Sequence, residues 1–247
     1  MLKVMKFGGT SVDSQAHRHC AIEKIKQALK AGYKTVVVVS AMGRKEEPYS
    51  TNTLMGFTDY LQPDAKDRLL AQGEILSSLV FENQCRQEGL NAHAFTASEA
   101  GILTDDHYGS AKVLKVSLMW YKHYLNEMDV LIVPGFIGLS LSGHLTTLGK
   151  GGSDKTAILL SDALSADCTV IYTDVAGIYD CDPKQNAQAK RYSWLSFDEC
   201  LSLVKQGASV MMKESVELAK AKNIEFYVAP TFSEGIGTKV SGKNKVC

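Results

Sequence analysis

The sequence contains no run of 18 apolar residues and no signal peptide, so nothing in it predicts a membrane-spanning helix or secretion. Neither charge is in excess, because lysine plus arginine and aspartate plus glutamate each total 27. Balanced charge argues against the basic surface of a general nucleic-acid binder or of a protein that lies on acidic membranes. We therefore expect a cytoplasmic protein whose partners are small molecules, with no nucleic acid and no membrane among them.

Metal-binding and disulfide patterns are missing as well. The six cysteines are scattered and form no C-x-x-C pair, which argues against a zinc site and against a disulfide framework. No internal repeat and no low-complexity segment is present. What remains is a chain of 247 residues, 45% of them hydrophobic, which is long enough to bury a large core without cross-links.

Strand and helix patterns alternate along nearly the whole chain. Short apolar runs predict buried strands at 2–7, 35–39, 92–95, 130–133, 168–172 and 224–228. Helical patterns include 67–84, 156–165, 207–221 and 196–206, and Ser196 and Glu199 form a capping box for the last of these. Residues 96–111 have turn chemistry and are expected to form a loop. This order predicts an α/β fold, a three-layer αβα sandwich around a largely parallel sheet.

Residues 146–157 read TTLGKGGSDKTA and place three glycines within four residues, around Lys150. Glycine permits positive φ and lets the backbone approach a ligand closely. We expect Ser153 or Asp154 to cap the helix that follows, and the free N–H groups of a helix N-terminus attract anions. The stretch therefore predicts a phosphate or carboxylate site, although an ordinary glycine-rich loop is the alternative.

A second glycine-rich turn, Gly-Gly-Thr-Ser, directly follows the first strand, which has Lys6 near its carboxyl end. Ligands of parallel sheets bind beyond the carboxyl ends of strands, so both turns are expected to converge there. Plain solvation is the alternative for a lysine at a strand end. Together, Lys6, Lys150 and Asp154 suit the handling of a transferred phosphoryl group, which needs positioning and positive charge more than covalent chemistry.

Gly73 and Glu74 lie inside the helix expected at 67–84. A glycine within a helix costs about 1 kcal/mol relative to alanine, so we expect Gly73 to permit the close approach of another segment. Glu74 is either a solvated helix carboxylate or a group that faces the cleft and binds a substrate amino group. The polar loop at 45–52, which contains Pro48, is expected to be a mobile segment over the site.

Neither G-x-x-x-x-G-K-[ST] nor G-x-G-x-x-G is present. The motifs instead resemble those of aspartate kinases, in the amino acid kinase family. In chain order they are K-F-G-G-T-S at 6–11, S-A-M-G at 40–43, P-Y-S-T-N-T-L at 48–54, G-E at 73–74, A-G-I at 100–102, G-F-I-G at 135–138, T-L-G-K-G-G-S-D at 147–154, T-D-V-A-G-I-Y at 173–179 and D-P-K at 182–184. The resemblance covers essentially the whole chain.

The resemblance implies the amino acid kinase fold, which is similar to that of carbamate kinase. It also implies ATP-dependent phosphorylation of the side-chain carboxylate of L-aspartate to 4-phospho-L-aspartate, the first step of lysine, threonine and methionine biosynthesis. Two alternatives stay open. One is a paralogue that acts on another acidic substrate in a dedicated pathway. The other is a weakly catalytic, nucleotide-binding chain that pairs with another subunit.

By motif position, the resemblance implies that Lys6 stabilises the transferring phosphoryl group, that Asp154 orients the lysines and that Glu74 holds the substrate amino group. The implied catalytic residues are Lys6, Asp154 and Lys213. The implied substrate-binding residues are Gly8, Gly9, Thr10, Ser40, Thr51, Glu74, Lys150, Gly151, Gly152 and Ser153. The implied nucleotide-binding residues are Lys6, Gly8, Gly9, Thr173, Asp174, Tyr179, Asp182, Lys184 and Ser209. Mg²⁺ is expected to accompany ATP, held mostly by phosphates and water rather than by protein ligands.

Two residues depart from the family pattern. The arginine of its G-R-G-G-S-D motif is Lys150 here, which keeps the positive charge but loses the bidentate fork that fits a carboxylate. The lysine of its later G-A-K-V motif, which would reach the ATP phosphates, is Ser209. Lys213 lies about one helical turn further on and is the candidate replacement.

The resemblance implies one catalytic domain over residues 1–247. Residues up to about 145 would bind the amino acid, and residues from about 146 would bind the nucleotide. The regulatory ACT domains that usually follow in this family are not part of the sequence, so we expect no feedback inhibition through such domains in this chain. The oligomeric state stays open, with a homo-oligomer among the possibilities.

Overall fold

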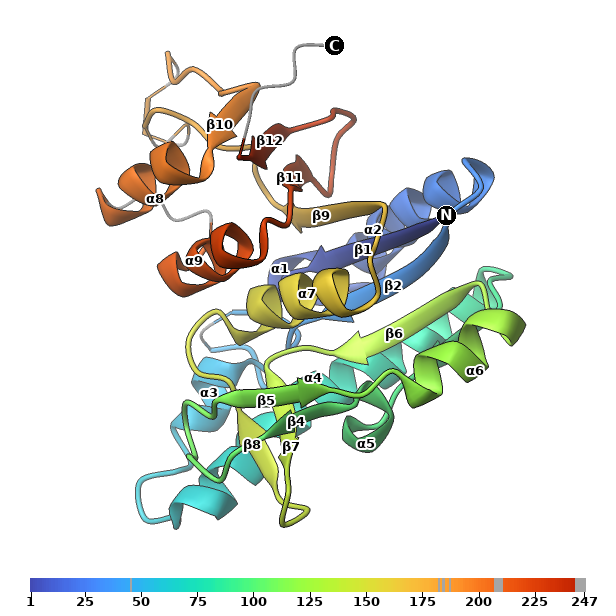
Figure 1. Cartoon of the computed structure of the whole chain (residues 1–247), viewed down its shortest axis with the longest axis vertical. Coiled ribbons are helices and arrows are strands. Elements are labelled where there is room, and N and C mark those ends of the chain that lie inside the picture. The colour runs from blue at the N-terminus through green and yellow to red at the C-terminus, as the bar shows by residue number, and fades with distance from the viewer. Residues whose placement is uncertain (45, 182, 184, 187, 207–210, 243–247) are drawn as a thin grey trace.

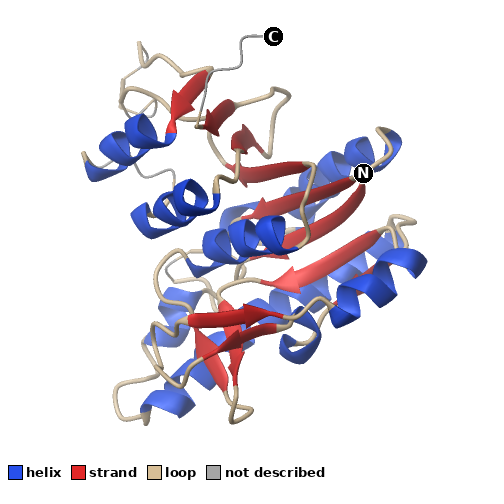
Figure 2. Cartoon of the chain, in the orientation of Figure 1, coloured by secondary structure: helices blue, strands red, loops and turns tan. Residues whose placement is uncertain are grey.

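The computed structural model describes residues 1–44, 46–181, 183, 185–186, 188–206 and 211–242. Its strands form two sheets, and helices cover both faces of the larger one (Figures 1 and 2). The helices are α1 (Gly9–Val12), α2 (Gln15–Lys30), α3 (Thr51–Met55), α4 (Pro63–Gln87), α5 (Ala97–Ala100), α6 (Met119–Glu127), α7 (Gly152–Ala163), α8 (Phe197–Lys205) and α9 (Lys213–Lys222).

The larger sheet has eight strands in the order β10-β12-β11-β9-β1-β2-β6-β3, and each neighbouring pair is parallel except β11 and β12. These strands are β1 (Leu2–Phe7), β2 (Lys34–Val39), β3 (Ala92–Ala94), β6 (Val130–Pro134), β9 (Cys168–Thr173), β10 (Trp194–Ser196), β11 (Phe226–Pro230) and β12 (Thr238–Ser241). The structure confirms the expected α/β fold and its largely parallel central sheet.

Strand β2 shows why this sheet is the middle layer. Side chains alternate between the two faces of a strand, and all four valines of β2 are fully buried. Val36 and Val38 belong to a core cluster shared with α7 and α9, whereas Val37 and Val39 belong to a second cluster shared with α2 and α4. Both faces of the sheet are therefore apolar and covered, as a parallel sheet requires.

The register of the central strands brings their carboxyl ends to one edge. Phe7 at the end of β1 pairs with Val39 at the end of β2 and with Tyr172 near the end of β9, and Val39 pairs with Pro134 of β6. The loops that leave these strands therefore start side by side. This edge is the place where the expected site has to assemble.

A smaller sheet of four strands, with the order β5-β4-β7-β8, lies below the larger sheet and beyond β6 in the view of Figure 1. Its strands are β4 (Ile102–Thr104), β5 (Val113–Val116), β7 (Ile137–Ser140) and β8 (Leu145–Thr147). β7 and β8 form an antiparallel hairpin inserted between β6 and the glycine-rich turn at 149–152. This sheet was not predicted, because strands of three or four residues have too little periodicity to stand out.

Two local expectations were wrong, and two further elements are present with other bounds. Residues 96–111 are not all loop, since they contain α5 and β4, and α5 has its own capping box from Thr96 to Glu99. Neither Ser153 nor Asp154 caps α7, because Gly151 is the N-cap residue and both side chains lie within the first turn. The last strand predicted at 224–228 is displaced to Phe226–Pro230. The helix expected over 207–221 starts at Lys213 within the described residues, and 207–210 lie outside them.

Candidate functional site

The centre of the site is an ion pair between Lys6 and Asp154. Lys6 Nζ lies 2.8 Å from Asp154 Oδ1, and the two side chains are only 13% and 10% exposed. Lys6 comes from β1, and Asp154 comes from the first turn of α7, where a carboxylate interacts favourably with the helix dipole. The pair keeps a cation at the sheet edge in a poorly solvated place, where it interacts with an anion more strongly than it would in water.

The turn after β1 packs directly on the loop after β2. A Cβ atom on Gly9 would lie 2.5 Å from the carbonyl oxygen of Gly43 and 2.6 Å from that of Ala41, closer than any real contact. A Cβ on Gly8 would lie 3.5 Å from Lys6 Nζ. Only glycine at position 9 therefore lets the two loops meet. Ser40 belongs to the same arrangement, since its N–H donates to the Phe7 carbonyl.

Glu74 lies on α4 beneath these loops and is 1% exposed. Its Oε1 accepts hydrogen bonds of 3.3 Å from the Ala41 N–H and from the Thr51 hydroxyl. Its Oε2 has no hydrogen-bond partner within the part of the chain that the structure describes. Burial raises the pKa of Glu74 to about 8, against the weaker effect of these two donors. Glu74 is therefore a buried carboxyl group with one free oxygen, which is not the solvated carboxylate of the simpler alternative.

Gly73 permits the approach of the segments above Glu74, as expected. A Cβ atom there would lie 2.9 Å from Ala41 Cβ and 2.9 Å from the Tyr49 carbonyl oxygen. The polar loop thus contacts α4 at Tyr49, and Thr51 begins α3 with its hydroxyl on Glu74. Lys45, the first residue of that predicted loop, lies outside the described residues.

The glycine-rich turn before α7 adopts the backbone that its sequence predicts. Gly149 and Gly151 have φ of 74° and 72°, a region that favours glycine. A Cβ atom on Gly152 would lie 2.7 Å from Phe136 Cδ2, so α7 packs tightly on the link between β6 and β7. Lys150 lies between the glycines with its side chain exposed. It is therefore accessible to an anion, but it forms no part of the Lys6–Asp154 pair.

Phe136 in that link packs against the glycine-rich turn and has a backbone conformation that the sequence did not predict. It has φ of +66°, which is unusual for a bulky residue, and its N–H donates 3.2 Å to the Thr156 hydroxyl of α7. Strained backbone of this kind persists only where its surroundings hold it, and it is common at functional sites. Its only signal was the match to the family's G-F-I-G motif, which says nothing of φ.

The expected nucleotide segment leaves the end of β9. Thr173 is the last residue of that strand, and Asp174 follows with Oδ2 2.9 Å from an Arg44 nitrogen. Arg44 comes from the loop after β2, so this ion pair links the loops of two strands. Tyr179 is half-buried and forms an isolated β-bridge with Arg191. Asp182, Lys184 and Ser209 lie outside the described residues.

Lys213 begins α9, close to the glycine-rich turn but not in it. A Cβ atom on Gly151 would lie 2.6 Å from Met212 Cβ, so the residue before Lys213 touches the turn. The Lys213 ammonium group itself pairs with Glu217 of the same helix at 3.2 Å and is about half exposed. The structure therefore brings its backbone to the site and leaves its charge on the side of α9.

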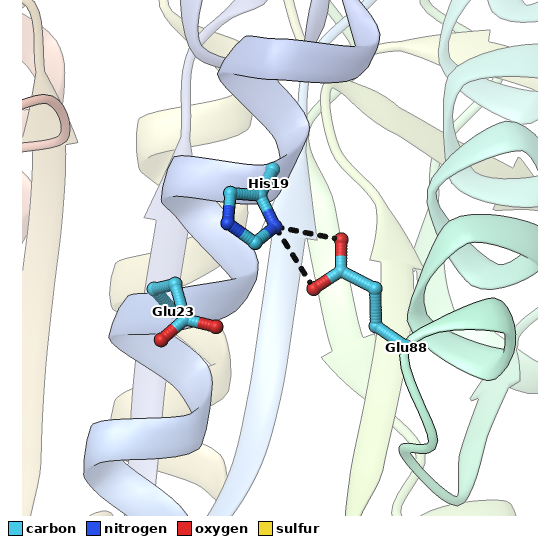
Figure 3. A group of neighbouring side chains, drawn as sticks. All are labelled: His19, Glu23 and Glu88. Atoms are coloured by element: carbon cyan, nitrogen blue, oxygen red, sulfur yellow. Dashed lines mark hydrogen bonds and ion pairs between the residues drawn. The ribbon is translucent and has the colours of Figure 1, made fainter.

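Two features away from the sheet edge do not enlarge the site. His19 and Glu23 of α2 face Glu88 at the end of α4, a group with the ligand types of a metal site (Figure 3). Lys26 already fills the cationic position, with Nζ 2.8 Å from Glu23 and 2.9 Å from Glu88. The group is thus an ion-pair network that joins two helices. Separately, a cavity of about 490 Å³ lies between β5, α7 and α9 and includes neither Lys6 nor Asp154.

Across the described residues, no helix is both long enough and apolar enough to cross a bilayer.

The site is a polar edge of a parallel sheet, with two glycine-rich turns, a shielded lysine and a buried glutamate. Such an edge can bind two anionic groups side by side near one cation, which is the arrangement that phosphoryl transfer needs.

In sequence, this chain is similar to kinases of the amino acid kinase family. The model of the amino acid kinase family matches residues 1–230. Aspartokinase 1 of Bacillus subtilis (strain 168) is 39% identical over 242 residues, which are 96% of this chain and 60% of that protein. The aspartokinase of Mycolicibacterium smegmatis is 38% identical over 247 residues, 98% of this chain and 57% of that one. The chain thus spans about 60% of the length of these relatives.

Solved structures agree with the fold. Aspartate kinase from Synechocystis superposes with a TM-score of 0.85 at 31% identity and covers 100% of this chain and 40% of its own. E. coli aspartokinase III, in complex with aspartate and ADP, superposes with a TM-score of 0.83 at 27% identity, over 100% of this chain and 66% of its own. From the family match over residues 1–230 and this shared architecture, it follows that the chain belongs to the amino acid kinase family.

Proposed function

We propose that this chain is the catalytic part of an aspartate kinase, which transfers the γ-phosphoryl group of ATP to the side-chain carboxylate of L-aspartate. The observation that carries the proposal is the shielded Lys6–Asp154 pair at the meeting point of two glycine-rich turns. The names of the most similar relatives, and the aspartate and ADP bound by one of them, support the choice of substrate. The product, 4-phospho-L-aspartate, would enter lysine, threonine and methionine biosynthesis.

In the proposed reaction, an oxygen of the substrate carboxylate attacks the γ-phosphorus. The bond from that phosphorus to the bridging oxygen breaks, and its electron pair leaves with ADP. The products are an acyl phosphate and ADP, and no proton has to be removed from the carboxylate nucleophile. The chain's task is therefore to position two anions and to offset their repulsion.

Lys6 would contact the equatorial oxygens of the transferring group, where negative charge has to be stabilised. Asp154 would hold the Lys6 ammonium in place through their 2.8 Å ion pair. Backbone N–H groups of residues 8–10, of Gly151 and of Ser153 would bind phosphate and substrate oxygens, whereas the Gly152 N–H already donates to the Gly149 carbonyl. The residues up to about 145 would bind the amino acid, and those from about 146 would bind the nucleotide, including Thr173, Asp174 and Tyr179.

Glu74 and Lys150 would hold the α-ammonium and the α-carboxylate group of L-aspartate, which leaves the side-chain carboxylate free to attack the γ-phosphorus. The free Oε2 of Glu74 is a buried acceptor with no partner in the described residues, which suits the substrate ammonium group. The exposed Lys150 suits the substrate carboxylate. Mg²⁺ would come with ATP, held by phosphates, water and few protein oxygens, because Asp154 already pairs with Lys6. When bound, it would neutralise phosphate charge.

A second candidate is phosphorylation of a different acidic substrate, and Lys150 is the observation that favours it. A lysine binds a carboxylate as a point charge, whereas the family's arginine fixes the carboxylate's plane with two parallel hydrogen bonds. A less fixed α-carboxylate would let the amino acid shift in the site, so that acidic side chains of other lengths could bring their carboxylate to the γ-phosphorus. A weakly catalytic, nucleotide-binding chain is the third reading, and the placement of Lys6 and Asp154 argues against it.

The test is the trapping of the acyl phosphate as a hydroxamate, with purified chain, Mg²⁺, ATP and either L-aspartate or L-glutamate. We expect hydroxamate with L-aspartate and at least tenfold less with L-glutamate. Product with another acidic amino acid alone would support the second candidate. ATP binding without product from any acidic amino acid would refute both kinase readings and favour the third.

A further inference from the structure

Asp67 is the other buried carboxylate of α4, and nothing in the sequence motifs assigns it a role. It is 1% exposed and lies seven residues before Glu74, which is two helical turns and about 10 Å along the helix axis. Residues with this spacing share one face of a helix. Within the described residues, Asp67 has no lysine, arginine or histidine within ion-pairing distance, so hydrogen bonds alone stabilise its carboxylate.

Those hydrogen bonds come from one loop of the smaller sheet and from the end of its strand β8. Thr147 donates its N–H to Oδ2 at 2.7 Å and its hydroxyl to Oδ1 at 3.0 Å. Gly109 donates its N–H to both oxygens, at 3.0 and 2.9 Å. The Thr147 carbonyl in turn accepts the N–H of Ala111 at 2.8 Å. One side chain thus fastens three separate segments: α4, the loop at 105–111 and the end of β8.

Thr147 is where the glycine-rich turn begins. It is the last residue of β8, and only Leu148 and Gly149 separate it from Lys150. Gly149 also rests on the tethered loop, because a Cβ atom there would lie 3.4 Å from the Gly109 carbonyl oxygen. The hydrogen bonds to Asp67 therefore fix both the start of the turn and the surface against which it packs.

We propose that Asp67 is a positioning residue that sets the distance between the two substrate-binding ends, Glu74 and Lys150. Glu74 is part of the same helix, and Lys150 is held through Thr147, so α4 acts as the common rigid element. A substrate with an ammonium group on Glu74 and a carboxylate on Lys150 has to span this fixed separation. The role rests on the proposed function, since it takes these two residues as substrate contacts, and Asp67 itself contacts no substrate.

Asp67→Asn tests the idea with almost no change in volume. Asparagine replaces one acceptor oxygen of Asp67 with an amide nitrogen, which is itself a donor. That nitrogen would face an N–H or hydroxyl donor, so at least one buried donor loses its partner. We expect the KM for L-aspartate to rise at least tenfold while the KM for ATP stays within twofold. The nucleotide segment after β9 is expected to be spared because none of the hydrogen bonds of Asp67 reaches it.

Two matched variants separate positioning from general damage. Thr147→Val removes one hydrogen bond to Asp67 and keeps the other donors, so the KM for L-aspartate should rise about threefold; Thr147→Ser keeps the hydroxyl and should stay within twofold. Glu82→Gln makes the same acid-to-amide change on α4, at a carboxylate whose ion-pair partner among the described residues is Arg86, and should change neither KM.

Amide hydrogen exchange gives a readout that does not need turnover. In Asp67→Asn, the N–H groups of Gly109 and Thr147 should exchange at least tenfold faster than in the wild type, while amides of β1 and β2 keep their rates. Unchanged exchange at both amides, or equal rises in the KM for ATP and L-aspartate, would overturn the positioning role. A wild-type chain without aspartate turnover would instead overturn the proposed function, and the exchange rates would still decide whether Asp67 holds the turn.

Discussion

We predict that Glu74 makes a contribution to the stability of this protein that falls as the pH rises. Its carboxyl group is 1% exposed, and burial raises its pKa from the ordinary value of 4.5 to about 8. Between these two values the folded chain holds a proton that the unfolded chain has released. Stability therefore decreases through this window and is level again above about pH 8.

Each pH unit in that window costs about 1.4 kcal/mol, so the group removes on the order of 4 kcal/mol of stability between pH 5 and pH 8. Glu74→Gln keeps the shape of the side chain but carries no titrating proton, and so it lacks this slope. Hydrogen bonds lower the pKa values of Glu88 and Glu99, so the stability that these groups add is fully present above their ordinary pKa. That contribution is the same in the wild type and in Glu74→Gln.

The assay is urea unfolding of the wild type and of Glu74→Gln at pH 5, 6, 7 and 8. We expect the variant to gain about 3–4 kcal/mol relative to the wild type across this range. Parallel pH profiles, with a difference that changes by less than about 0.5 kcal/mol, would refute the reasoning. They would mean that Glu74 is ionised in the folded chain, with a cation or water on Oε2.

The same pKa predicts how a substrate ammonium group would bind. An ammonium group on Oε2 favours the ionised carboxylate, so binding of L-aspartate at pH 7 should release about one proton. Calorimetry in two buffers with different ionisation enthalpies measures that release directly. Binding without proton release would place the ammonium group elsewhere, and the release should vanish in Glu74→Gln.

Two stability predictions concern single contacts. Gly73→Ala should lower the free energy of unfolding by about 1 kcal/mol net. Alanine in a helix gains roughly 1 kcal/mol over glycine, but a Cβ atom 2.9 Å from Ala41 Cβ and from the Tyr49 carbonyl oxygen costs more than that by overpacking. An unchanged urea midpoint would contradict this. Ser196→Ala should lower the free energy of unfolding by about 1 kcal/mol, since both hydrogen bonds of the capping box between Ser196 and Glu199 are present. A loss below about 0.3 kcal/mol would show that the capping box does not stabilise α8.

The central strands could be predicted because each is a short run of apolar residues that must be buried on two faces. β1 was predicted with the bounds it has, and β2 within one residue. The second sheet could not be predicted, because strands such as β4 and β8 have three residues each and are stabilised by pairing with neighbouring strands. The same limit applies to β10, a three-residue strand that pairs only with β12 in the described sheet.

The site was predictable where residue type alone determines the contact. Gly73 permits the predicted close approach, and Lys6 and Asp154 lie together where the two glycine-rich turns were expected to converge, although their pairing was implied by the family resemblance rather than by residue type. The direction of a long side chain could not be read from the sequence, so the pairing of Lys213 with Glu217 was not foreseen. Asp67 was missed because a buried carboxylate and a solvated one look the same in a helix. Its spacing of seven residues from Glu74 was the one available signal.

The most direct test of the role of Lys6 measures phosphoryl transfer in Lys6→Met, which removes the shielded charge and keeps most of the side-chain length. With saturating L-aspartate and Mg²⁺-ATP, we predict a fall in the single-turnover rate of about 10²–10³, with the affinity for ADP within fivefold of the wild type. A transfer rate within fivefold of the wild type would contradict the claim that the Lys6–Asp154 pair stabilises the transferred group.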